Sequence, residues 1–112
     1  MKMRIYVSGP YTADTPTQIE ENIDAAREAA LELLRMGHTP FCPHTHTAFW
    51  DVYGPDLPDE RFLRLGLDWL ERCDAILLLP GWENSEGSKV EMGRAEELEL
   101  QVFDDIEMVP PA

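Results

Sequence analysis

Three features of the sequence predict a domain in which a sheet of four or five mainly parallel strands carries helices on both faces. First, β-prone runs alternate along the chain with stretches of helical periodicity. Second, Ala75–Leu79 is almost continuously apolar, as expected of a strand buried on both faces. Third, the 112 residues suit a single domain, residues 1–112, with no internal repeat and no linker.

The first strand and the first helix have clear boundary signals. Met3–Val7 is a short β-prone run. Thr15 then suits the N-cap of a helix, Pro16 suits the first helical position, and Gln18 completes a capping box. Apolar residues follow at helical spacing until Gly37, which is expected to end the helix in a left-handed conformation.

The remaining elements follow from the same patterns. A loop as long as the one expected after the second strand is usually functional or mobile in so small a domain. The predicted elements are a weak strand at Thr39–Cys42, irregular chain over His44–Pro58, a helix over Asp59–Arg72, a strand at Ala75–Leu79, a helix over Ser88–Leu100 and a short strand within Val102–Val109.

A flavodoxin-like strand order of 2-1-3-4, one form of a Rossmann-like doubly wound sheet, would make the first and third strands neighbours. Ligands of such sheets bind at the carboxyl ends of the strands, where the winding direction changes. The loop SGPYTAD at residues 8–14 and the loop PGWENSEG at residues 80–87 leave these two strands. The two loops are therefore expected to face each other across a ligand site.

Composition limits the kinds of partner. The formal net charge of −13 and the pI near 4.4 disfavour binding to a nucleic-acid polymer. No apolar run approaches the ~20 residues of a membrane span, and the apolar run at the N-terminus is too short for a signal peptide. We therefore expect a cytoplasmic protein, with Cys42 and Cys73 reduced rather than joined.

Glu91, Asp68 and Tyr6 each have a structural and a functional interpretation. Glu91 fits a capping box that begins at Ser88, but it also suits a catalytic carboxylate beside a glycine-containing loop. Asp68 stands four residues from an arginine on each side, which is typical of a solvated salt-bridge ladder. Tyr6 either packs as an ordinary strand residue or provides a phenol that orients a carboxylate.

Two other groups of residues are weaker candidates. His38, His44 and His46 have no third ligand at a suitable spacing, so neither a metal nor another cofactor is predicted. Trp50 and Trp82 lie in loops, where packing is the ordinary role and stacking on a nucleobase is the alternative.

Three segments together resemble a known superfamily. They are IYVSGPYT at residues 5–12, the passage from Asp68 to Asp74, and LLPGWENSEGSKVEMGRA at residues 78–95. Their order and placement are similar to the nucleoside 2-deoxyribosyltransferase-like superfamily, most closely its small DUF4406 branch, which is related to the deoxynucleoside 5′-monophosphate N-glycosidases. The most specific part is the pattern S-x-G-x-x-x-E-x-G-x-A from Ser85 to Ala95.

The resemblance implies roles for individual residues. It makes Glu91 the nucleophile, Asp68 the acid that contacts and protonates the leaving base, and Tyr6 the residue that holds the nucleophile. It also makes Gly9, Ser85, Gly87 and Ser88 residues that line the sugar site. Pro10, Tyr11 and Trp82, from the same two loops, are further predicted substrate-binding residues.

The resemblance also implies an activity. We expect cleavage or transfer of the N-glycosidic bond of a nucleoside or nucleotide through a glycosyl-enzyme intermediate. The alternative is a non-catalytic module that binds a nucleotide or an ADP-ribose-like ligand. The phosphate-binding Ser and Arg of the monophosphate glycosidases correspond here to Pro10 and Thr12, which favours an unphosphorylated substrate. A homo-oligomer with shared active sites is also implied.

Overall fold

A four-stranded parallel sheet lies at the centre of the molecule, and the computed structural model describes all of residues 1–112. The strand order is β2-β1-β3-β4, so β1 and β3 are the two central neighbours. This confirms the predicted doubly wound α/β fold. The strands are β1 Arg4–Ser8, β2 Thr39–Phe41, β3 Ala75–Leu78 and β4 Gln101–Phe103.

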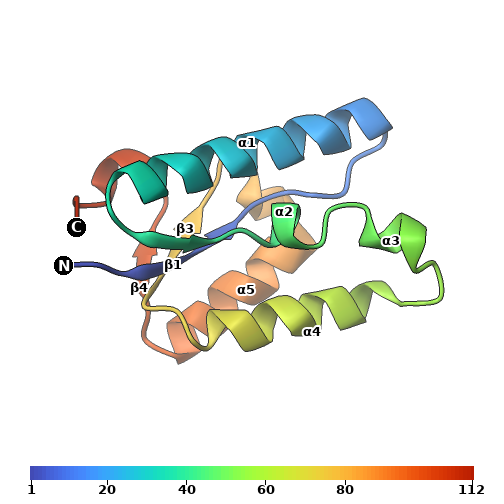
Figure 1. Cartoon of the computed structure of the whole chain (residues 1–112). Coiled ribbons are helices and arrows are strands. Elements are labelled where there is room, and N and C mark those ends of the chain that lie inside the picture. The colour runs from blue at the N-terminus through green and yellow to red at the C-terminus, as the bar shows by residue number, and fades with distance from the viewer.

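Helices cover both faces of the sheet. Helix α1 (Pro16–Arg35) lies on one face, and helices α4 (Asp59–Leu70) and α5 (Glu86–Glu97) lie on the other (Figure 1). The segment predicted to be irregular contains two single-turn helices, α2 (Pro43–His46) and α3 (Trp50–Tyr53). Single 3-10 turns occur at Trp82–Asn84 and Ile106–Met108. The short strand predicted within Val102–Val109 is β4, which begins one residue earlier than expected, and the second 3-10 turn follows it.

Alternation along the strands divides the buried side chains into two clusters. Ile5 and Val7 of β1 pack toward α1, in a cluster that includes Ala26 and Leu33. Tyr6 faces the opposite way, toward α4 and α5. The second cluster consists of Tyr6, Leu70, Ile76, Leu78 and Ala95. The sheet therefore places an apolar core on one face and a core that includes a phenol on the other.

The predicted boundaries of α1 are confirmed. The hydroxyl of Thr15 accepts a hydrogen bond of 3.2 Å from the backbone N–H of Gln18. Gly37 has a φ of 93°, the left-handed conformation expected after the helix.

The start of α5 corrects a prediction. Ser85, not Ser88, caps this helix, because the Ser85 hydroxyl accepts a hydrogen bond of 3.2 Å from the backbone N–H of Ser88. The capping box predicted for Ser88 and Glu91 is therefore wrong. The helix begins at Glu86, and Glu91 lies in its second turn, where a capping role is not available to it.

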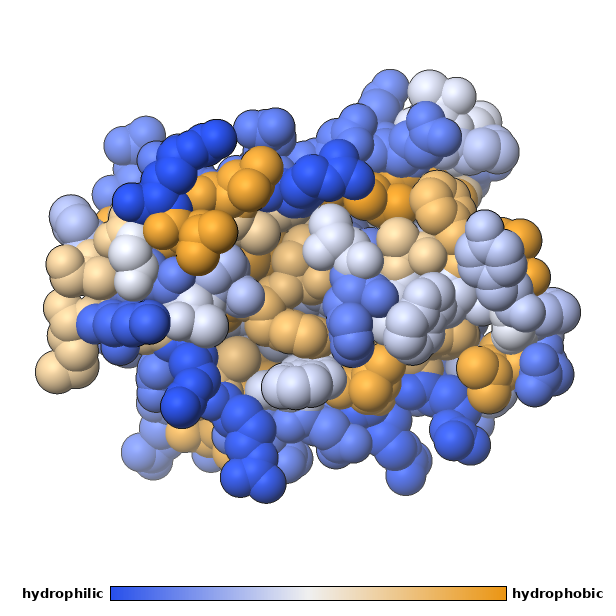
Figure 2. Space-filling view, in the orientation of Figure 1, coloured by the Kyte–Doolittle hydropathy of each residue, from blue (hydrophilic) through white to orange (hydrophobic).

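The surface is mostly hydrophilic over α1 and along the opposite side of the molecule, with less polar residues visible between them (Figure 2). Exposed apolar and aromatic side chains gather in one segment, at Phe49, Trp50, Val52, Tyr53 and Leu57. No helix combines the length and the apolar character needed to cross a membrane. A cytoplasmic location stays a prediction.

Candidate active site

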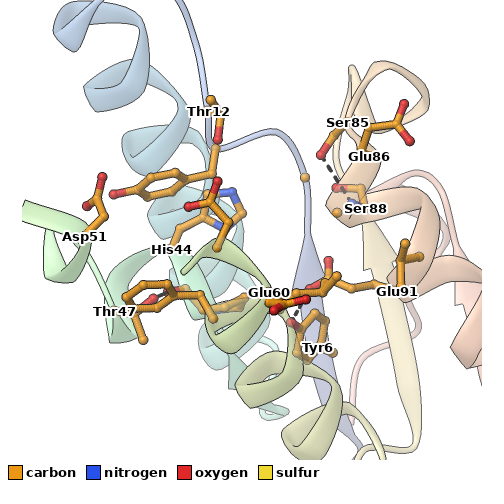
Figure 3. Close-up of a pocket in the computed structure, with 18 of the residues that line it drawn as sticks. Tyr6, Thr12, His44, Thr47, Asp51, Glu60, Ser85, Glu86, Ser88 and Glu91 are labelled. Carbon is orange, nitrogen blue, oxygen red and sulfur yellow. Dashed lines mark hydrogen bonds between the residues drawn. The ribbon is translucent and has the colours of Figure 1, made fainter. Parts of the chain in front are cut away.

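The carboxyl group of Glu91 lies beyond the central strands and is held by two hydroxyl groups of β1. The phenol of Tyr6 donates a hydrogen bond to Oε2, and the hydroxyl of Ser8 donates a hydrogen bond of 2.7 Å to Oε1. Tyr6 and Ser8 are two residues apart on one strand, so both face the same side of the sheet. Figure 3 shows Tyr6 and Glu91 directed toward each other.

Burial controls the protonation of this pair. Burial raises the pKa of Glu91, while the hydrogen bonds from Tyr6 and Ser8 act in the opposite direction and favour the carboxylate. Burial also raises the pKa of Tyr6, and the adjacent Glu91 raises it further. The phenol therefore stays protonated and remains a donor to the carboxylate.

Helix α4 approaches this pair closely because residue 66 is glycine. A Cβ atom at Gly66 would overlap the hydroxyl group of Tyr6 and would stand 3.3 Å from Oε2 of Glu91. Any larger side chain would therefore push the helix or the tyrosine away. The sequence analysis did not identify Gly66, because a lone glycine within a helical pattern gives no sign of what it faces.

A cavity of about 650 Å³ opens beside Glu91, within the size range of small-molecule sites. It is lined by four segments that meet at the carboxyl ends of the strands. Residues after β1, residues after β2, the first turns of α4 and the chain from Asn84 to Glu91 all contribute. This is the edge of the sheet at which the ligand site was predicted.

The structure brings most of the predicted site residues together. Those that line the cavity are Tyr6, Gly9, Tyr11, Ser85, Gly87, Ser88 and Glu91. Pro10 and Trp82 do not line it. The carbonyl of Pro10 instead accepts a hydrogen bond of 2.9 Å from Nε2–H of His44, and Trp82 packs against the cluster around Tyr6.

Asp68 is the main correction to the predicted site. It is exposed on α4 and is not among the residues that line the cavity. Leu63, Gly66 and Leu70 face inward, and helical geometry turns position 68 away from them. Asp68 also forms no ion pair with Arg64 or Arg72, so the predicted salt-bridge ladder is not formed either.

Ser8 and His44 were missed as site residues. Ser8 is fully buried, and its alternation with Tyr6 is the signal that identifies it. His44 is buried in the cavity wall, and burial lowers the pKa of its imidazole, which favours the neutral ring. His44 was missed because its position depends on the fold of the segment after β2. The sequence of that segment shows neither helical nor strand periodicity.

The first loop is held at both ends. Gly9 packs tightly, since a Cβ atom there would lie 2.9 Å from Cβ of Leu79. The backbone carbonyl of Tyr11 accepts a hydrogen bond of 3.1 Å from the side chain of Asn22. The hydroxyl of Tyr11 accepts one of 3.3 Å from the backbone N–H of Phe49. The loop is thereby tied to α1 and to the segment before α3.

No three His, Cys, Asp or Glu side chains stand close enough to hold a metal ion. The site presents a half-buried carboxylate with two hydroxyl donors beside an open cavity.

A comparison with protein families gives a match over residues 3–104 to a family described as "Domain of unknown function (DUF7768)". The chain belongs to this family. No curated protein matches the sequence. The site of this DUF7768 domain therefore has to be interpreted from its own geometry.

Proposed function

We propose that this protein cleaves or transfers the N-glycosidic bond of a nucleoside, with Glu91 as the nucleophile. The observation that carries the proposal is the position of the Glu91 carboxyl group. It is half-buried at the carboxyl ends of neighbouring parallel strands, held by Tyr6 and Ser8, and open to a cavity large enough for a nucleoside. The resemblance of the segments around these residues to nucleoside 2-deoxyribosyltransferases supports the same assignment.

The proposed reaction has two displacement steps. A Glu91 oxygen attacks C1′ as the C1′–N bond breaks, and the bonding electrons leave with the base. The positive charge that develops on the sugar is stabilised by the adjacent carboxylate. A second base or a water molecule then attacks C1′ and releases the carboxylate, giving transfer or hydrolysis.

Tyr6 and Ser8 act as positioning residues in this scheme. Their hydrogen bonds fix the two oxygens of Glu91 and favour its ionised form against the effect of burial. A nucleophile held in one rotamer does not have to be ordered at the moment of reaction, which lowers the activation barrier.

A binding module without turnover is the second candidate, and one observation favours it. Asp68, the acid that the resemblance implies for departure of the base, does not line the cavity. Such a module would be stabilised against heat by a nucleotide or an ADP-ribose-like ligand, with no base released.

The test is chromatographic detection of free or exchanged base after incubation with a panel of nucleosides and deoxynucleosides. We expect base release by the wild-type protein and none by Glu91→Gln. Glu96→Gln is the matched control, because Glu96 is exposed on the same helix and lies outside the cavity. Full activity in Glu91→Gln would exclude Glu91 as the nucleophile, and ligand-dependent stabilisation without base release would favour the binding module.

A homo-oligomer is part of the proposal. Phe49, Trp50, Val52 and Tyr53 are exposed apolar side chains on either side of Asp51, which lines the cavity. A second copy packed on this segment would cover apolar surface and would bring its own residues close to the mouth of the site. This arrangement is what sharing of active sites requires.

A further inference from the structure

Every side chain with a formal charge that lines the cavity is acidic. The five are Asp51, Asp59, Glu60, Glu86 and Glu91, and no Lys or Arg lines the cavity. Figure 3 labels four of them, Asp51, Glu60, Glu86 and Glu91. Glu86 is paired with Lys89 at 3.0 Å, whereas Asp51, Asp59 and Glu60 form no ion pair. A cleft lined by one sign of charge attracts ligands of the opposite sign and repels ligands of the same sign.

A bare metal ion does not explain this charge, because no three potential ligands stand together. Two buried polar atoms point instead to an organic ligand. Nδ1 of His44 and Oγ of Ser88 have no hydrogen-bond partner, although these residues are only 5% and 1% exposed and both line the cavity. Buried polar atoms are nearly always paired, so a ligand with hydroxyl or amino groups is the natural partner.

The direction of one of these bonds is fixed by the structure. Because Nε2–H of His44 donates to the carbonyl of Pro10, Nδ1 of the neutral ring is an acceptor. A donor group on a ligand, such as a sugar hydroxyl, would pair with this acceptor. The cavity combines negative charge with a site for a neutral polar group.

The position of possible proton donors limits which base can depart from this site. A neutral base usually leaves with a proton supplied by a nearby acid. Asp68 is outside the cavity, and Asp51, Asp59 and Glu60 are exposed to solvent. Exposed carboxyl groups on the cavity wall attract cationic ligands, and none of these three is buried beside Glu91.

Resting on the proposed function, we propose that the preferred substrate is a nucleoside whose base carries a permanent positive charge, such as an N7-alkylated purine or a pyridinium nucleoside. Breakage of its C1′–N bond returns the electron pair to the ring nitrogen, so the base departs neutral and needs no proton. Glu91 forms the bond to C1′, and water then supplies the hydroxyl group while its proton passes to solvent. The same charges repel a 5′-phosphate.

The experiment measures kcat/KM for 7-methyl-2′-deoxyguanosine, 2′-deoxyguanosine and ribosyl nicotinamide, with the corresponding 5′-monophosphates. We expect both cationic nucleosides to be preferred over the neutral one and the monophosphates to react more slowly. The double variant Asp59→Asn/Glu60→Gln removes two charges of the cavity. Glu96→Gln/Glu107→Gln removes two exposed charges elsewhere and is the matched control.

Comparison of variants separates the effect of the cavity from the greater intrinsic lability of cationic nucleosides, which is the same for each enzyme. We expect the ratio of kcat/KM for the cationic substrate to that for the neutral substrate to fall about threefold or more in Asp59→Asn/Glu60→Gln, but not in Glu96→Gln/Glu107→Gln. For the wild-type protein, the same ratio should fall in high salt, because salt screens the charges of the cavity. An unchanged ratio, with both substrates cleaved, would overturn this inference and leave the proposed function standing. No base release from any nucleoside would overturn the proposed function and this inference with it.

Discussion

The phenol of Tyr6 donates a hydrogen bond to the carboxylate of Glu91, 85 residues further along the chain. The two residues belong to β1 and α5, which are brought together by the parallel pairing of β1 with β3. This contact joins a central strand to the helix that follows its neighbour, and it fixes the group that we propose as the nucleophile.

Tyr6→Phe should lower kcat while the fold is retained, because the ring stays buried and only the donor to Glu91 is lost. A hydrogen bond to a charged group is worth about 1.5–3 kcal/mol, which corresponds to roughly a 10- to 100-fold lower rate. Steady-state kinetics of base release is the measurement. Tyr53→Phe is the control, since the hydroxyl of Tyr53 is exposed and makes no hydrogen bond, and phenylalanine keeps the apolar ring. A fully active Tyr6→Phe would mean that Glu91 needs no support from the strand.

Gly66→Ala should also reduce activity, by displacing the Tyr6 hydroxyl from Glu91. Gly93→Ala is the matched control, because a Cβ atom at Gly93 meets nothing within 4 Å. The helix propensity of alanine should stabilise the Gly93 variant by about 0.5–1 kcal/mol. Activity and thermal unfolding of both variants separate the effect on the site from that on the helix. If Gly66→Ala were as active as Gly93→Ala, α4 would not lie as close to Tyr6 and Glu91 as the structure indicates.

The stability of Glu91→Gln should depend on pH relative to the wild type. Burial raises the pKa of Glu91 above its ordinary value of 4.5, so the folded wild type binds more protons than the unfolded chain. The contribution of Glu91 to the free energy of unfolding therefore falls as the pH rises from about 4.5 through the raised pKa. Glutamine does not titrate.

The melting temperature of Glu91→Gln minus that of the wild type should therefore increase with pH over this range and then level off. Calorimetry in buffers between pH 4 and pH 8 measures this difference. A difference that shrinks with rising pH would show that the hydrogen bonds from Tyr6 and Ser8 outweigh burial. The pH dependence of kcat/KM should rise on its acidic side through the same pKa, since the nucleophile must be ionised.

Asp68→Asn should leave kcat/KM for base release unchanged, because Asp68 is exposed and does not line the cavity. Loss of a general acid would instead lower the rate by about a hundredfold or more. Kinetics with a nucleoside that has a neutral base distinguishes the two results. A large loss of kcat/KM in Asp68→Asn would support the role of general acid that the resemblance implies for Asp68. The Asp68 carboxyl group would then have to serve the active site of a neighbouring copy.

The double variant Val52→Ser/Tyr53→Ser should shift the protein toward the monomer. Both side chains are largely exposed in one copy, and their replacement removes apolar surface that an oligomer would cover. Light scattering coupled to size-exclusion chromatography measures the mass. Met108→Ser is the control, because Met108 is also largely exposed but lies far along the chain from this segment. A wild-type protein that is already monomeric would exclude this interface.

The sequence allowed prediction of the layered fold because its signals are local. Thr15, Pro16 and Gly37 delimit α1, and the apolar run at Ala75–Leu78 identifies the central strand. The strand order predicted that the two loops face each other, and the contact of Tyr6 with Glu91 was implied by the resemblance. These features depend on periodicity and topology, which a single sequence contains.

The features that were missed depend on tertiary context. Ser85 and Ser88 are both plausible N-caps, and only the packing of α5 decides between them. The rotation of α4 decides that Gly66, and not Asp68, faces the site. His44 reaches the cavity because Pro10 offers it a carbonyl from another loop. None of these relationships has a signature within a short window of sequence.

The alternation of β1 has a consequence for how this protein can fail. Ile5 and Val7 face α1, whereas Tyr6 and Ser8 face Glu91, so sliding β1 by one residue would exchange the two sets. Such a slip would bury two hydroxyl groups among aliphatic side chains and would leave a carboxylate without donors. Correct strand pairing and assembly of the reactive centre are therefore one event, and a misregistered chain would lose its thermal resistance together with its chemistry.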